Sequence, residues 1–149
     1  MSLLEDAFKA LKSAREEFEE HLKTGDPMKL RDACEKGWLT MVLATDYLLT
    51  CAGAEKTKGR VERNELIEAL EKHVPEVREL GLADRMWARA TRLHAEGFYE
   101  GLMGKESLET ELEKVERYTE DVEKVAEIVS SRREDLKEIL NKVQERFKR

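Results

Sequence analysis

Apolar residues recur every three to four positions along most of the chain, which is the spacing of one face of an α-helix. This pattern predicts helices over residues 3–23, 27–52, 64–74 and 84–103, and from residue 107 onward. Alternating β-branched residues bounded by turn residues, the pattern of a strand, do not occur. The sequence therefore predicts an all-α fold: an antiparallel up-and-down helical bundle of four main helices with a long, heptad-patterned C-terminal helix.

Short polar segments mark the predicted helix boundaries. Asp26 is a suitable N-cap for the second helix, because Pro27 after it fits the first helical position. The N-caps predicted for the later helices are Asn64, Asp84 and Ser107. Two glycines one turn apart on the fourth helix, Gly97 and Gly101, indicate close approach of a neighbouring element.

The last helix carries a heptad stripe from Leu108 to Phe147 and would be about 60 Å long if unbroken. It either bends near Ser130-Ser131 and folds back, or its outer half projects and pairs with another chain. We favour the second arrangement because no Gly or Pro interrupts the pattern. We therefore divide the chain into a bundle of residues 1–130 and an oligomerising extension of residues 131–149. We expect a homodimer through this extension and the wide apolar face of the second helix.

Composition narrows the classes of partner. Charged residues make up 40% of the 149 residues, and the net charge is −6. The surface as a whole therefore repels nucleic acid and anionic lipid. A local basic patch is still compatible with this composition. Neither end has an apolar stretch long enough for a signal peptide or a membrane span, which predicts a cytoplasmic protein without a membrane partner. Abundant Glu, Lys and Arg with few Asn and Gln is typical of a thermophilic source.

Most catalytic constellations are missing from the sequence. It contains neither a phosphate-binding glycine loop nor a CxxC pair. The three histidines lie on different predicted helices without metal-ligand spacing, so we predict no metal and no cofactor. Cys34 and Cys51 lie about 25 Å apart on one predicted helix and cannot pair with each other, which favours two small buried thiols.

Residues 87–100 concentrate the remaining candidates for chemistry. His94 shares the apolar side of its predicted helix, which favours a core histidine bonded to a neighbouring helix. In the alternative interpretation, Arg89 binds a phosphodiester and His94 shuttles a proton as general acid or base. The predicted contact surface is a groove whose lining and flanking residues are Trp87, Arg89, Arg92, His94, Tyr99 and Glu100.

This region also carries a resemblance to a known family. Trp87, the run Leu93-His-Ala-Glu-Gly-Phe-Tyr-Glu100, and the earlier Gly25-Asp-Pro27 before the Trp38 helix resemble the archaeal paralogous-repeat (PaREP) proteins over about residues 4–129. That family is grouped with the HEPN superfamily of helical bundles. The resemblance therefore implies a HEPN-like bundle.

Active HEPN proteins are metal-independent ribonucleases, often toxins, that carry an Arg-x(4–6)-His motif and act as dimers. Arg89 and His94 match that spacing, but the residue after the arginine, usually polar in active enzymes, is Ala90 here. On a regular α-helix, five residues also turn two side chains more than about 100° apart. Other HEPN proteins have lost the motif and serve as binding modules, some beside nucleotidyltransferase partners.

Three functional hypotheses follow. The favoured one is a non-catalytic HEPN-like binding or scaffold module for a nucleotide, RNA or a protein partner such as a nucleotidyltransferase. The second is a metal-independent endoribonuclease that uses Arg89 and His94. The third is a structural coiled-coil assembly protein. Whether the chain is an enzyme stays open at this point, with the non-catalytic role preferred.

Overall fold

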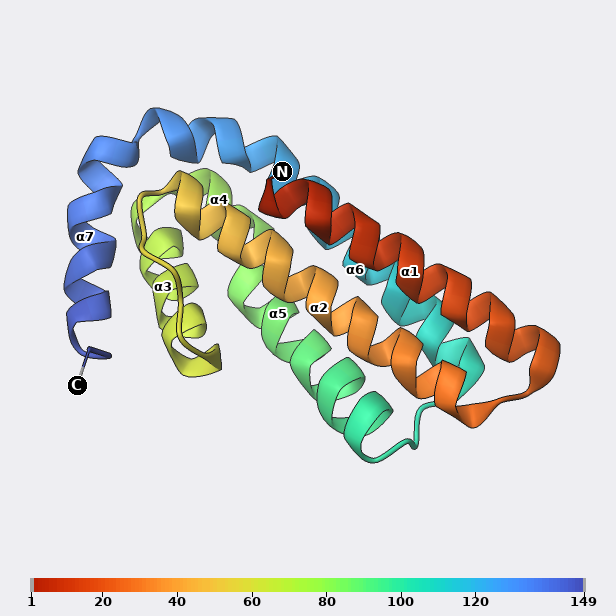
Figure 1. The fold of residues 1–149 in the computed structure, drawn as a ribbon. Helices are drawn as coiled ribbons and strands as arrows, with labels where there is room; N and C mark the ends of the chain where they lie inside the picture. Colours follow the sequence, from red (N-terminus) through yellow and green to blue (C-terminus); the bar gives the residue numbers. More distant parts are fainter. Residues whose placement is uncertain (1, 149) are drawn as a thin grey trace.

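The computed structural model describes residues 2–148, and every regular element within them is helical (Figure 1). The elements in chain order are α1 (Leu3–Thr24), α2 (Pro27–Cys51), α3 (Arg60–His73), α4 (Pro75–Leu80), α5 (Leu82–Arg89), the π-helix η1 (Ala90–Tyr99), α6 (Lys105–Ser131) and α7 (Arg133–Glu145). The predicted all-α class is confirmed.

The long elements form an antiparallel bundle. α1, α2, the continuous α5–η1 segment and α6 run alongside one another and alternate in direction (Figure 1). α2 packs against α1, η1 and α6, so the most apolar helix of the sequence lies at the centre. α3, α4 and α7 gather at the end of the bundle where α2 finishes.

The turn between α1 and α2 forms as the sequence predicts. Gly25 ends α1 with φ 74°, a left-handed conformation that glycine adopts without strain, and its N–H donates to His21 O. The carboxylate of Asp26 accepts a hydrogen bond from Met28 N at 2.9 Å, and Pro27 is the first residue of α2. These hydrogen bonds give a partner to a carbonyl at the end of α1 and to an N–H at the start of α2, within a connection of two residues.

The core continues along α2 between α1 and α6. Its α2 members include Trp38, Met41 and Leu48, which are packed with buried residues of the neighbouring helices. One polar contact crosses this core, between the hydroxyls of Thr45 and Tyr118 at 2.5 Å. Because both hydroxyls are buried, each depends on the other for its hydrogen bond.

Three predicted N-caps are wrong. α3 begins at Arg60 rather than at Asn64, α5 begins at Leu82 before Asp84, and α6 begins at Lys105 before Ser107. The residues at these N-cap positions are Gly59, Gly81 and Gly104, none of which donates or accepts through a side chain. Glycines at the starts of helices are a weaker signal than Asp, Asn or Ser, which explains the error.

The prediction that the C-terminal helix projects from the bundle is also wrong. α6 ends at Ser131, Arg132 has φ −108° and ψ 13°, and α7 turns back to pack on α3 (Figure 1). Leu136 and Leu140 of the heptad stripe are consequently buried within the chain itself. Gln144 fixes the far end of α7, because its amide bonds to both the Glu55 backbone and the Glu62 carboxylate.

Candidate functional site

The predicted site segment is a π-helix rather than a regular α-helix. Hydrogen bonds that join residues five apart widen its turns, yet Arg89 and His94 still face different helices, α6 and α2. Gly97 permits this segment to approach α2, because a Cβ there would lie 2.6 Å from Cys34 Sγ. The close approach predicted for Gly97 is therefore confirmed.

The end of η1 is held by α2. Arg31 donates from Nε to Phe98 O at 2.8 Å and from Nη2 to Tyr99 O at 2.9 Å, which satisfies carbonyls at the helix end. Gly101 follows in a left-handed conformation, with φ 66°, and lies outside the helix. The prediction that Gly97 and Gly101 share one helix is wrong for this reason.

Arg89 and Arg92 both face α6, where they meet one carboxylate. Arg89 Nε lies 2.5 Å from Glu111 Oε2, and Arg92 Nε lies 3.4 Å from Glu111 Oε1. The Nε–H of Arg89 does not point at Glu111 Oε2 as in a hydrogen bond, so the contact is an ion pair only. Arg92 also binds Glu96 through Nη1 at 2.9 Å. Arg89 is only 8% exposed, so this ion pair lies inside the protein.

A basic cavity lies beside this ion pair, between α5 and α6. Its volume is about 320 Å³, and the residues that line it are all cationic: Arg85, Arg89, Lys114 and Arg117. Two carboxylates offset part of this charge, Asp121 through Arg85 Nη1 at 2.9 Å and Glu111 through Arg89. The four cations therefore leave an excess of positive charge in a chain whose net charge is −6.

Two contacts hold Arg85, one of the residues that line the basic cavity. The guanidinium of Arg85 lies over the buried ring of Tyr118, 5.3 Å from its centroid. Burial raises the pKa of Tyr118 to about 12, although the hydrogen bond to Thr45 opposes the shift. Tyr118 therefore stays neutral below that pH, and Arg85 is held both by the face of this ring and by the Asp121 carboxylate.

A second depression adjoins the basic cavity along α6. It has a volume of about 370 Å³ and shares Lys114 with the basic cavity. Its lining mixes charges and hydroxyls: Arg92, Glu106, Ser107, Thr110, Glu111 and Lys114. Glu111 lines this second depression and reaches the basic cavity only through its ion pairs with Arg89 and Lys114.

His94 faces α2 rather than α6. Its Nδ1 lies 2.9 Å from Glu35 Oε1, and its ring lies between those of Trp38, Phe98 and Tyr99 at centroid distances of 6.0, 6.4 and 4.9 Å. A carboxylate on Nδ1 fixes the orientation of the imidazole. The predicted hydrogen bond to a neighbouring helix is thus present, with Glu35 as the partner.

Trp87 lies on a third face. The residue is 55% exposed, and the guanidinium of Arg60 lies over its ring, 5.3 Å from the centroid. It lines a cavity of about 330 Å³ together with the acidic residues Glu68, Glu71 and Asp84. Burial raises the pKa of Glu71, a hydrogen bond from the Ala83 backbone opposes the shift, and the nearby Asp84 and Glu68 carboxylates add to it.

The single groove predicted from residues 87–100 is therefore divided among three faces. Arg89 and Arg92 line hollows on α6, His94 and Tyr99 pack near α2, and Trp87 faces α3. Glu100 is exposed at the end of η1. The assigned roles of these six residues stay predictions.

Sequence reasoning missed Arg85, Lys114 and Arg117. A signal was available, because Arg85 and Arg89 are four residues apart and Lys114 and Arg117 three apart, which puts each pair on one helical face. The sequence does not show how α5 and α6 are aligned, and this alignment brings Arg85 and Arg89 opposite Lys114 and Arg117.

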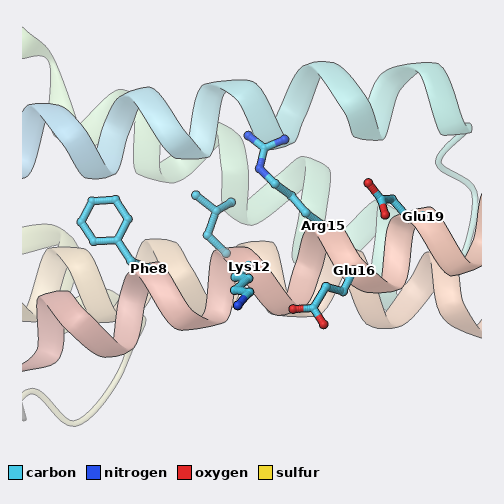
Figure 2. A pocket seen from close by; sticks show the side chains of 6 residues that line it. Phe8, Lys12, Arg15, Glu16 and Glu19 are labelled. Atoms are coloured by element: carbon cyan, nitrogen blue, oxygen red, sulfur yellow. The ribbon is translucent and has the colours of Figure 1, made fainter.

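Another cavity lies on α1 and contains none of the predicted residues. Its volume is about 280 Å³, and Figure 2 shows Phe8 and Arg15 extending from α1 toward α6. Arg15 binds Glu116 there at 3.1 Å. The lining also includes Lys12, Glu16 and Glu19, so its charges are mixed.

The two cysteines are free thiols; Cys34 is fully buried as predicted, whereas Cys51 is only partly buried. Burial, reinforced by Glu35 and Glu111, raises its pKa to about 11. Within residues 2–148, His, Cys, Asp and Glu side chains form no group of three or more that could hold a metal ion. No helix in the same residues combines the length and apolarity needed to cross a bilayer.

The fold and these hollows define a class: an all-helical bundle protein with a concentrated cationic cavity on an acidic surface. The sequence profile of the archaeal PaREP1/PaREP8 family matches residues 3–119, and the chain belongs to that family. The match ends inside α6, so α1 to η1 and the part of α6 that lines the basic cavity all fall within it. No curated protein and no solved structure matches the chain.

Proposed function

We propose that this PaREP-family chain is a non-catalytic, HEPN-like binding module that takes phosphate groups of RNA or of a nucleotide in the basic cavity. The observation that carries the proposal is the lining itself: four cationic side chains surround one hollow in a chain of net charge −6. The field of these side chains attracts an anion locally although the whole molecule repels one.

The side-chain chemistry fits phosphate better than a simple anion. Three of the four cations are arginines, whose planar guanidinium groups bind two phosphate oxygens at once. Arg85 and Arg89 are held by Asp121 and Glu111, so they lose little freedom when a ligand arrives. Arg117 has no ion-pair partner within residues 2–148, and it is the cation most available to the ligand.

A direct test measures binding of a fluorescent single-stranded RNA and of a labelled nucleotide by polarisation, with chelator present. We expect affinity to fall as salt rises, and Arg117→Gln to weaken binding about tenfold, the loss of roughly one charged hydrogen bond. Lys23→Gln removes one positive charge at the exposed end of α1 and serves as the matched control. Equal losses from both variants, or no binding by the unaltered chain, would refute the proposal.

The second candidate function is metal-independent RNA cleavage, favoured by the Glu35–His94 contact. A carboxylate that fixes Nδ1 leaves Nε2 of the imidazole to exchange a proton with substrate. The assay above separates the two functions, because a binding module returns the RNA intact. Cleavage that persists in chelator and disappears in His94→Ala would replace the binding-module proposal with the nuclease.

A further inference from the structure

The connection between α6 and α7 interrupts a helix whose sequence pattern continues through the interruption. Val129, Arg133 and Leu136 keep the alternating spacing of four and three residues, and no Gly or Pro stands between residues 105 and 148. Nevertheless α6 ends at Ser131, and Arg132 leaves helical geometry. A bend without Gly or Pro requires another local cause, such as a side chain that competes for backbone hydrogen bonds.

Ser131 supplies that cause. Its hydroxyl donates to Ile128 O at 2.6 Å, and this carbonyl is the one that Arg132 N–H would bond in a continuous α-helix. Arg132 N–H bonds to Val129 O instead, at 3.1 Å. Serine hydroxyls that bond back to the preceding turn bend helices. This side-chain hydrogen bond therefore favours the bent connection over a straight one.

α7 belongs to this fold mainly through α3. Leu136 and Leu140 are buried, and Gln144 Nε2 donates to the Glu62 carboxylate at 2.9 Å. If α7 moved away alone, both leucines would be exposed and the buried Glu62 would lose a hydrogen bond, which is unfavourable. A second copy of this chain has the same α3 surface, including Glu62, and could bind α7 through the same contacts.

We propose that α7 exchanges between two copies of this chain and forms a domain-swapped dimer in which α6 and α7 are one continuous helix. Each contact between α3 and α7 is lost within one chain and regained with the other, so the packing is conserved. The dimer gains the backbone hydrogen bonds that the bend interrupts and joins the two halves of the heptad stripe. Protein concentration sets the balance between the two forms.

The first experiment changes the bend. Ser131→Ala removes the competing hydroxyl and favours helix, and two bends straighten in each dimer, so we expect the dimer dissociation constant to fall about tenfold. Light scattering after size exclusion, over a series of protein concentrations, measures it. Ser13→Ala makes the same exchange inside α1 and should leave the constant unchanged. Ser131→Gly, which disfavours a continuous helix, should raise it.

The second experiment detects the exchange itself. Ala69 of α3 and Val143 of α7 line the same hollow, so cysteines there lie within reach of a short bifunctional maleimide. In a Cys51→Ser background, Ala69→Cys chains are mixed and refolded with Val143→Cys chains. A swapped dimer links one chain of each kind, whereas the bent monomer brings the two positions together only within a single chain.

The outcomes are decisive in both directions. Cross-links between the two singly substituted chains, increased by Ser131→Ala, support the exchange. Folded Ser131→Ala that stays monomeric at every concentration overturns it, as does a doubly substituted chain that links only to itself. If Ser131→Ala does not fold by circular dichroism, Arg132→Ala takes its place, since it removes the 3.5 Å Arg132–Glu76 ion pair at the bend.

Discussion

Arg89 and Glu111 form an ion pair inside the protein, with Arg89 Nε 2.5 Å from Glu111 Oε2 and both side chains at most one-tenth exposed. The pair joins the last residue of α5 to α6 and presents the arginine to the basic cavity. A buried charge is costly unless an opposite charge compensates it. The position of Arg89, and with it one wall of the cavity, therefore depends on Glu111.

The first prediction concerns this carboxylate. Glu111→Gln leaves Arg89 buried without its counter-charge and removes an ion-pair partner of Arg92. We expect the free energy of unfolding to fall by about 3 kcal/mol, the usual cost of breaking a buried ion pair from one side. Urea denaturation followed by circular dichroism measures it. Glu113→Gln, exposed on the same helix, should change stability by less than about 0.5 kcal/mol. Equal stability of the two variants would show that Arg89 does not need Glu111.

The second prediction concerns the contact between η1 and α2. In Gly97→Ala the new Cβ would lie 2.6 Å from Cys34 Sγ and 2.9 Å from Cys34 Cβ, so the two elements must separate. We expect a loss of about 2 kcal/mol, typical of overpacking in a core. Gly59→Ala is the matched control, because nothing lies within 4 Å of a Cβ there and its φ of −179° suits any residue. A Gly97→Ala chain that unfolds at the wild-type urea concentration would contradict the prediction.

The bundle was predictable because its helices are amphipathic and its first turn is marked by strong local signals. Asp26 and Pro27 define a helix start by side-chain chemistry alone, and both have their predicted roles. Arg132 shows the limit of this reasoning. The heptad spacing is the same whether α7 projects or folds back, and the bend depends on one serine hydroxyl and on packing against α3. The sequence pattern alone therefore does not determine whether α7 projects or folds back.

The candidate site was less predictable than the fold for a similar reason. The spacing of Arg89 and His94 is a property of the sequence, but the carboxylates that receive them, Glu111 and Glu35, come from α6 and α2. Which helix faces each side chain follows from the π-helical turn and from the register between helices. Neither is encoded by a short motif. The basic cavity was missed because it forms only when α5 and α6 are adjacent.

The third prediction is a pH dependence of stability. Burial first, and then the nearby Glu35 and Glu111, raise the pKa of Cys34 from its usual 9.0 to about 11. Above pH 9 the unfolded chain releases this proton while the folded chain retains it, so stability is full below pH 9 and declines toward pH 11. The decline due to this thiol should be about 2 kcal/mol, and urea denaturation across that range measures it. Cys34→Ala should flatten the profile, and an unchanged slope in this variant would exclude Cys34 as its source.

The fourth prediction concerns the attachment of α7. The Gln144 side chain accepts from Glu55 N at 2.9 Å and donates to Glu55 O and to the buried Glu62 carboxylate. Gln144→Ala leaves these groups without their partner, and we expect a loss of about 3 kcal/mol in urea denaturation. Gln144→Glu should be worse at neutral pH, because it places a second carboxylate beside Glu62, and should recover in acid as one of the two takes up a proton. Lys142→Ala, exposed on the same helix, is the control. If Gln144→Ala cost no more than Lys142→Ala, the buried amide would not be what holds α7 in place.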